Sequence, residues 1–230
     1  MYPTKKDTRI AALFYVLMGM PAPFALLYIP RTLIVRGDAA ATAKNILAHE
    51  MLFRAGIFGE LFSAVAFILL ALALYRLLSG VNKTRASLMV ILVAISVAIT
   101  FANVVNDIAA LALFRGDFLA APDKRQLEAL GMLFLGLHHQ GLVVNQIFWG
   151  LWLLPFGVLV MSSGFLPRIL GVLLIVNCFA YVAVSLTSLL LPSYANLVSR
   201  AVLPALLGEL WIWLWLLIKG AKPQPLAAAA

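Results

Sequence analysis

Residues 61–74 read LFSAVAFILLALAL, an apolar stretch in which Ser63 is the one polar residue. Polar and apolar residues do not alternate in it, so it does not predict a membrane β-strand, in which alternation over about ten residues is typical. A helix needs about 20 apolar residues to cross the hydrocarbon core of a bilayer, and this stretch lies inside such a run. Because similar runs recur along the chain, the sequence predicts an all-α, polytopic membrane protein.

The composition supports this fold class. Hydrophobic residues make up 64% of the chain and charged residues 11%, whereas soluble domains have about 45–50% and about 25%. The net charge is +8, but most lysines and arginines stand at the ends of apolar runs. Membrane topology and snorkelling place basic residues there, so we expect the lipid bilayer, and no nucleic acid, as their partner.

The apolar runs predict a bundle of six transmembrane helices in one integral membrane domain, residues 1–220, followed by a disordered C-terminal tail, residues 221–230. The first run continues past Pro21 and Pro23 without a small-residue cleavage site, so we expect a retained span and not a signal peptide. The two prolines should interrupt its backbone hydrogen bonding. The spans are expected at about residues 10–29, 54–76, 87–113, 142–161, 167–190 and 201–218.

An even number of spans places both termini on one side of the membrane. The basic residues divide almost evenly, nine on the side of the termini and eight on the other. Lys5, Lys6 and Arg9 crowd before the first span, which favours cytoplasmic termini. The two longest loops then lie on the extracytoplasmic side.

Both long loops carry signals for helices. Asp38 is a good N-cap for an amphipathic extracytoplasmic helix before the second span, and Ile46, Leu47 and Phe53 give that helix an apolar side. In the second loop, Asp123 is placed to cap a helix that begins at Lys124. We expect this helix to form an extension that runs directly into the fourth span.

Three motifs make the chain resemble the bacterial DUF4386 family of multispan membrane proteins. They are GDAAATAKNILAHEMLFRAGI (residues 37–57), LHHQG (137–141) and IFWGLWLLPFGVLVMSSGFLPRILGVLLI (147–175). The resemblance implies a helical domain of six or seven spans in a bacterial cytoplasmic (inner) membrane. It implies no catalytic residues, because the family is defined by sequence and its function is unknown.

Polar residues inside the spans are the candidates for function, because an ionisable side chain in a bilayer costs about 2.5–3.5 kcal/mol on insertion scales. Counting along spans of alternating direction places most of them in the same half of the bilayer. We therefore expect a polar pocket in the extracytoplasmic leaflet, which binds or transports a small molecule, a lipid head group or an ion. The candidate pocket residues are Glu50, Arg54, Glu60, Asn103, Asn106, Asp107, His138, His139, Asn145, Gln146, Asn177, Tyr181 and Glu209.

His138 and His139 stand at the entrance of the fourth span. Adjacent residues on a helix point about 100° apart, so the two imidazoles are not expected to chelate one ion together. We expect one of them to face the carboxylates of the second and third spans, and we expect that one to be His138.

Other interpretations of these polar residues stay open. A metal-dependent membrane hydrolase could draw ligands for zinc or another divalent metal from His49, His138, His139, Asp107 and Glu60, although no HExxH spacing is present. A bis-histidine haem site would need His49 with His138 or His139. The polar residues could also be purely structural contacts between helices. The sequence predicts no specific cofactor, and it leaves enzymatic activity and oligomeric state open.

Overall fold

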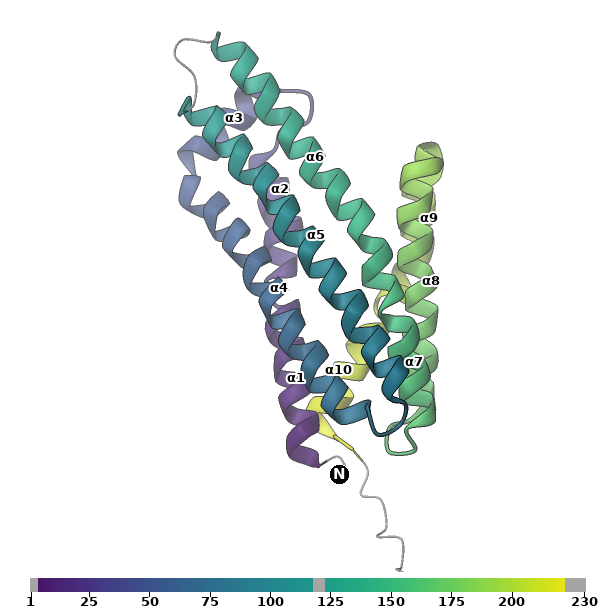
Figure 1. The fold of residues 1–230 in the computed structure, drawn as a ribbon. Coiled ribbons are helices and arrows are strands. Elements are labelled where there is room, and N and C mark those ends of the chain that lie inside the picture. Colours follow the sequence, from purple (N-terminus) through teal and green to yellow (C-terminus); the bar gives the residue numbers. More distant parts are fainter. Residues whose placement is uncertain (1–3, 118–122, 222–230) are drawn as a thin grey trace, which may run out of the picture. The chain divides into compact units, whose positions relative to one another are not determined.

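A computed structural model describes residues 4–117 and 123–221, and within these residues every regular element is a helix (Figure 1). The elements are α1 (Lys5–Gly19), the π-helix η1 (Pro23–Tyr28), α2 (Ile29–Leu33), α3 (Ala39–Ala48), α4 (Glu50–Leu78), α5 (Lys83–Arg115), α6 (Lys124–Leu151), α7 (Leu153–Ser162), α8 (Arg168–Leu190), the 3-10 helix η2 (Pro192–Tyr194), α9 (Ala195–Leu206) and α10 (Gly208–Ile218). The predicted disordered tail, residues 221–230, lies outside the described residues apart from Ala221.

Six helical segments are long and apolar enough to cross a membrane. They are Lys5–Leu33, Glu50–Leu78, Lys83–Arg115, Lys124–Ser162, Arg168–Leu190 and Pro192–Ile218. The predicted all-α polytopic fold with six spans is confirmed, and the chain is a multi-pass membrane protein. Most segments extend beyond the predicted apolar runs because their polar flanks are also helical. The fourth begins at Lys124 and not near residue 142, since the predicted extension is continuous with the span.

The two predicted helix starts are confirmed at the level of single hydrogen bonds. The backbone N–H of Ala41 donates to Oδ1 of Asp38 over 2.8 Å at the start of α3. The backbone N–H of Arg125 donates to Oδ1 of Asp123 over 3.1 Å at the start of α6. Each carboxylate satisfies a backbone donor that has no partner within its own helix.

Three of the spans are interrupted. The first breaks between α1 and η1, where Pro21 and Pro23 stand, as the sequence predicts. The fourth divides between α6 and α7, because Pro155 lacks the N–H that would bond to the carbonyl of Leu151. The sixth divides between α9 and α10 at Leu207, a break that the sequence analysis did not predict.

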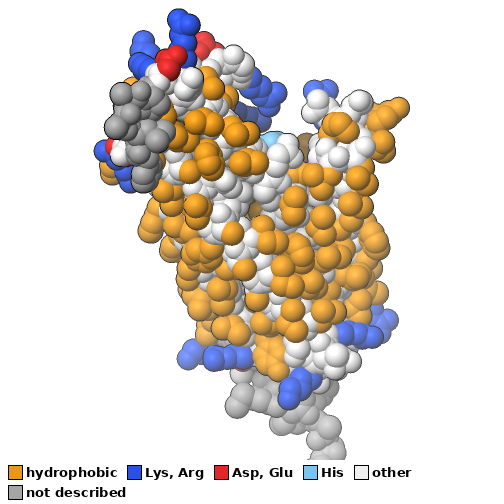
Figure 2. Space-filling view, turned by 45° about the horizontal axis from the view of Figure 1, so that its top comes forward, with side chains coloured by type: hydrophobic (Ala, Val, Ile, Leu, Met, Phe, Trp, Pro, Cys, Tyr) orange, Lys and Arg blue, Asp and Glu red, His pale blue; other side chains and the backbone are white. Residues whose placement is uncertain are grey.

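Large apolar side chains lie exposed along the spans. Phe58 of α4 is 68% exposed and Phe179 of α8 is 62% exposed. Figure 2 shows hydrophobic side chains over the flanks of the helices, with lysine and arginine side chains gathered at helix ends. In a bilayer these flanks face acyl chains and the basic groups reach the interface, which is the pattern expected of membrane spans.

The chain forms two compact units. Unit 1 comprises Met1–Val16, Phe67–Ser96 and Gln146–Ala230, and unit 2 comprises Leu17–Ala66 and Val97–Asn145. The continuous helices α4 and α5 contribute residues to both, and the single membrane domain stays a prediction.

The core of unit 2 joins α2, α3, α4, α5 and α6. Gly131 of α6 allows close packing there, because a Cβ atom at this position would overlap the ring of Phe114. Burying these side chains against one another fixes the ends of α4, α5 and α6 that carry the polar residues described below. The buried members are Ile29, Leu33, Ala43, Ile46, Phe53, Ala110, Leu111, Phe114 and Leu135.

The core of unit 1 is aromatic and includes a tight helix pair. The ring of Trp152 lies 5.1 Å from that of Phe67 and 5.4 Å from that of Phe156, measured between ring centroids. Gly157 of α7 and Gly171 of α8 face each other, and a Cβ atom on either would meet the backbone carbonyl of the other. Small residues let two membrane helices approach to backbone contact, which favours their association.

Candidate functional site

Three ionisable side chains from three helices converge in unit 2. Glu60 of α4 and Asp107 of α5 lie on either side of His138 of α6. The Nε2 atom of His138 lies 3.4 Å from Oε1 of Glu60, and its Nδ1 atom lies 3.3 Å from Oδ2 of Asp107. The side chains are only 10–11% exposed. Each residue offers a ligand atom, and these atoms lie within 4.8 Å of one another.

The helical period of α6 explains why His138 faces this cluster. Leu135, His138 and Asn145 are buried, whereas the adjacent His139 is exposed. Positions three and seven residues apart share one face of an α-helix. Of the two adjacent histidines, His138 is therefore the one that faces inward, as expected, and His139 points away from the cluster.

Asn103 holds the backbone of α6 at this point. Its Nδ2 atom donates to the backbone carbonyl of His138 over 2.9 Å, and its Oδ1 atom accepts from Nδ2 of Asn106 over 3.1 Å. Gly141 leaves the space for this side chain, because a Cβ atom there would overlap Asn103. Asn103 precedes Asp107 by four residues on α5, so the same helix face holds the histidine backbone and contacts its ring.

The polar contacts continue along the same pair of helices. The Nδ2 atom of Asn145 donates to Oγ1 of Thr100 over 2.9 Å. Asn145 lies two turns beyond His138 on α6, and Thr100 lies two turns before Asp107 on α5. Hydrogen bonds of this kind between membrane helices contribute about 0.6 kcal/mol each, so this pair is best explained as structural.

A second carboxylate cluster lies in unit 1, around Glu209 of α10. The hydroxyl of Tyr15 donates to Oε1 of Glu209 over 2.6 Å, and Nδ2 of Asn177 lies 3.4 Å from Oε2. The hydroxyl of Tyr181 also hydrogen-bonds to this carboxylate. All three partners are neutral side chains. Tyr15 was not a candidate in the sequence analysis, because its partner is 194 residues away along the chain.

At the start of α4, Glu50 pairs with two arginines of unit 2. Its Oε1 atom lies 2.6 Å from Nε of Arg54, the pairing that their spacing of four residues predicts, and 3.5 Å from Nη1 of Arg115. The sequence analysis did not name Arg115 as a candidate and counted it only among the basic residues of the loops. Nothing in its sequence context indicated that it would reach the first turn of α4.

The remaining candidates do not join these clusters. His49 follows the last turn of α3 and is exposed, and His139 is exposed as well. Within residues 4–117 and 123–221, Glu60, Asp107 and His138 are the group of metal-ligating side chains that converges. Gln146 belongs to unit 1, where its Oε1 atom is buried without a hydrogen-bond partner among the described residues.

The cluster of unit 2 suits a positively charged occupant. With both carboxylates ionised, its formal charge is −2 when the imidazole is neutral and −1 when the imidazole is protonated. Buried charge in a low-dielectric interior is costly unless it is compensated. A proton on the imidazole supplies part of that compensation, and a cation held between the imidazole and a carboxylate would supply more.

One of the comparisons with known proteins gives a match. A family model described as a domain of unknown function, DUF4386, matches residues 10–220. This confirms the resemblance carried by the three sequence motifs, and it assigns no residue a role. Comparison with curated proteins gives no match, and comparison with solved structures gives none either.

Proposed function

The chain is a member of the DUF4386 family, whose function is unknown, and on that premise we propose that its membrane bundle binds or transports a small cation at Glu60, Asp107 and His138. The observation that carries the proposal is the position of His138, each of whose ring nitrogens faces a carboxylate at 3.3–3.4 Å. Two carboxylates around one imidazole leave negative charge to be balanced, and a cation balances it.

The donor atoms favour a divalent transition metal such as zinc. Imidazole nitrogen and carboxylate oxygen bind Zn²⁺ at about 2.0–2.2 Å, so two such ligands on a tetrahedral ion lie about 3.3–3.6 Å apart. The distance of 3.4 Å between Nε2 of His138 and Oε1 of Glu60 falls in this range. A proton on Nδ1 would then face Asp107, which would fix the tautomer and the orientation of the ring.

In this arrangement the three side chains have different roles. His138 and Glu60 would be ligands, and Asp107 would position the histidine. Asn103 and Gly141 support them by holding the α6 backbone in register. Two protein ligands leave coordination positions for water or for a bound solute, so the site can accept a ligand and also release it.

Metal binding by the purified chain tests the proposal. After chelator treatment in detergent, equilibrium dialysis against Zn²⁺ or Mn²⁺ should load about one ion per wild-type chain. We expect His138→Gln and Glu60→Gln to abolish this binding, and Asp107→Asn to weaken it about 10–100-fold. His139→Gln and Glu209→Gln serve as matched controls and should bind like wild type. A wild-type chain that binds neither metal, or equal binding by all variants, would contradict the proposal.

A metal-dependent membrane hydrolase is the second candidate, because the same open coordination positions could hold a reactive water. The two functions differ in a measurable way. Transport predicts metal flux into proteoliposomes containing a metal-sensitive dye, and binding alone predicts bound metal with neither flux nor cleavage. A hydrolase predicts metal-dependent cleavage of an ester or peptide bond without flux.

We further propose that the chain lies in a bacterial cytoplasmic membrane with both termini cytoplasmic and that the cluster occupies the extracytoplasmic leaflet. The basic residues that precede the first span support this orientation. Labelling single cysteines placed in the Asp38 and Asp123 loops tests it, after Cys178 is replaced. A membrane-impermeant thiol reagent should modify both positions from outside the cell.

A further inference from the structure

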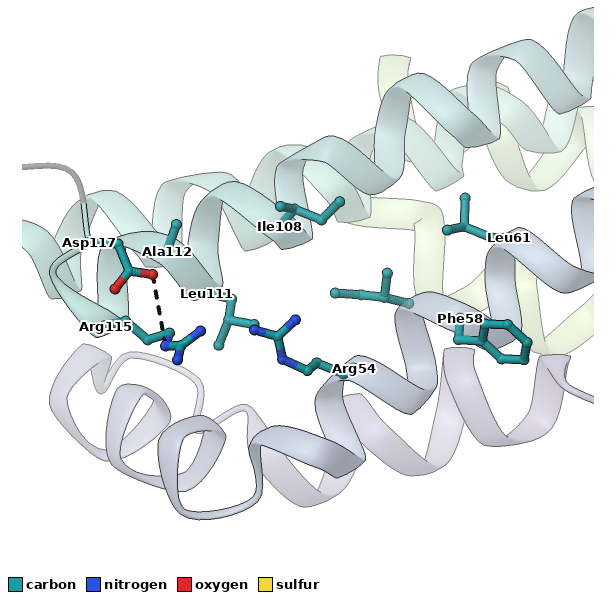
Figure 3. A pocket seen from close by; sticks show the side chains of 9 residues that line it. Arg54, Phe58, Leu61, Ile108, Leu111, Ala112, Arg115 and Asp117 are labelled. Atoms are coloured by element: carbon teal, nitrogen blue, oxygen red, sulfur yellow. Dashed lines mark ion pairs between the residues drawn. The ribbon is translucent and has the colours of Figure 1, made fainter.

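A groove in unit 2 carries chemistry that the cation site does not use. It lies between α4 and α5 and has a volume of about 420 Å³. Most of its lining is apolar, and two arginines and an aspartate stand at one end. Figure 3 shows the two guanidinium groups extending toward each other from the two helices. The lining residues are Arg54, Ile57, Phe58, Leu61, Ile108, Leu111, Ala112, Arg115 and Asp117.

We propose that this groove binds a membrane amphiphile, with its phosphate or carboxylate head group between Arg54 and Arg115 and its acyl chain along the apolar lining. The groove matches such a molecule because its charged end suits the head group and its apolar lining suits the acyl chain. Arg54 lies in the second turn of α4 and Arg115 ends α5, so both stand at the ends of membrane spans. Leu61 lies about 10 Å deeper along α4, at 1.5 Å per residue.

The guanidinium groups keep donors free for a head group. Arg54 contacts Glu50 through Nε at 2.6 Å, and Arg115 contacts it through Nη1 at 3.5 Å. Arg115 also approaches Asp117 through Nε, at 3.8 Å. A guanidinium has five N–H donors, so several remain without a partner among the described residues. The two arginine side chains are 47% and 41% exposed, within reach of a lipid.

The acidic neighbours position the arginines and do not block them. Glu50 contacts both guanidinium groups with the same oxygen atom, which holds the two groups near each other. The Asp117 contact is long, and the Asp117 side chain is 49% exposed, so a head group can displace it. Arginine binds phosphate or carboxylate through two parallel N–H bonds, a geometry that lysine lacks.

Retention of lipid by the purified full-length chain tests this site. The chain is reconstituted in nanodiscs of phosphatidylglycerol or of phosphatidylcholine, then washed in detergent, and bound lipid is measured by mass spectrometry. We expect about one phosphatidylglycerol molecule bound per wild-type chain. In the double variant Arg54→Gln/Arg115→Gln, the amount of bound lipid should fall about tenfold or more. Arg54→Lys/Arg115→Lys should also lose lipid, because charge alone does not restore the paired bonds.

A second variant tests the groove without disrupting the contacts of the two arginines. Ala112→Phe fills the groove and leaves both arginines in place, and it should also lose the lipid. Arg85→Gln, which removes an exposed arginine of α5 outside the groove, should retain it. Every variant is first shown to keep the thermal melting profile of a folded bundle.

The same reconstituted samples identify the kind of amphiphile that supplies the head group. Competition with oleate distinguishes a phospholipid site from a fatty acid site. A low concentration of oleate should displace phosphatidylglycerol only if the site prefers a fatty acid. Either result supports an amphiphile held by the arginines. Equal retention by wild type, the arginine variants and Ala112→Phe would overturn the proposal. Phosphatidylcholine carries the same phosphate, so equal retention of the two lipids would show that the arginines bind the phosphate and do not select the net negative charge of the head group.

Discussion

Unit 2 of this protein places two carboxylates inside the membrane bundle and unit 1 places one, Glu209, and the two units surround them differently. In unit 2, Glu60 and Asp107 share the imidazole of His138, a partner that can itself gain or lose charge. In unit 1, Glu209 accepts hydrogen bonds from Tyr15 and Asn177, whose side chains are neutral. A carboxylate surrounded by neutral donors is saturated and suits a structural role. Two carboxylates around a single imidazole remain short of positive charge, which suits a binding site.

Replacing His138 should have the largest effect on stability, because this residue distinguishes the cluster of unit 2 from that of unit 1. In His138→Ala, two carboxylates lose their shared partner, and breaking a buried charged pair in this way costs about 3–5 kcal/mol. The melting temperature in detergent should fall accordingly. Adding Glu60→Gln and Asp107→Asn to His138→Ala gives a triple variant in which the two charges are removed, so much of the lost stability should return. The control is His139→Ala, a change at the exposed neighbour, which should stay within about 0.5 kcal/mol of wild type.

That rescue is the decisive part of the experiment. If the triple variant is as unstable as His138→Ala alone, the histidine contributes packing and not charge compensation. The contrast between the two units would then disappear.

Gly141→Ala tests the support of the site without touching its charges. The new Cβ atom would overlap Asn103, which must move away from the His138 carbonyl. Such overpacking costs about 1–3 kcal/mol, and metal binding should weaken with it. Gly136→Ala on the same helix is the matched control, because no atom lies within 4 Å of its new Cβ. That control should gain about 0.5–1 kcal/mol from helix propensity, and equal behaviour of the two variants would refute the contact.

The smallest effect is expected in unit 1. Glu209→Gln keeps the shape of the side chain and removes its charge, and the partners can reorient because hydroxyl and amide groups both donate and accept. Its free energy of unfolding should change by less than about 1 kcal/mol, and metal binding should not change. A loss as large as that of His138→Ala would show that the two clusters are equivalent.

Features that depend on neighbouring residues could be predicted from the sequence. The spans follow from runs of apolar residues, and the starts of α3 and α6 follow from Asp38 and Asp123, each of which bonds within three residues of itself. The inward orientation of His138 follows from the helical period. Glu50 and Arg54 pair because they lie four residues apart on one helix.

Features that depend on which helices become neighbours could not be predicted. The convergence of Glu60, Asp107 and His138 requires the register of three helices, which no local pattern specifies. Tyr15 was missed because a tyrosine in an apolar run gives no sign of a distant carboxylate. The break at Leu207 is different, because Pro204 and Gly208 beside it are local signals that the sequence analysis did not use.

The close contact of Gly157 with Gly171 has a consequence for the order in which the protein is made. Helices α7 and α8 are joined by a short turn with Gly164 at a φ of 72°. They can therefore pair as a hairpin as soon as both have left the ribosome, because their contacts are local in the sequence. Glu209 and Tyr15 are 194 residues apart, so they can bond only after α10 is synthesised. Until then the ribosome-bound chain holds Tyr15 without its acceptor, and insertion of α10 completes unit 1.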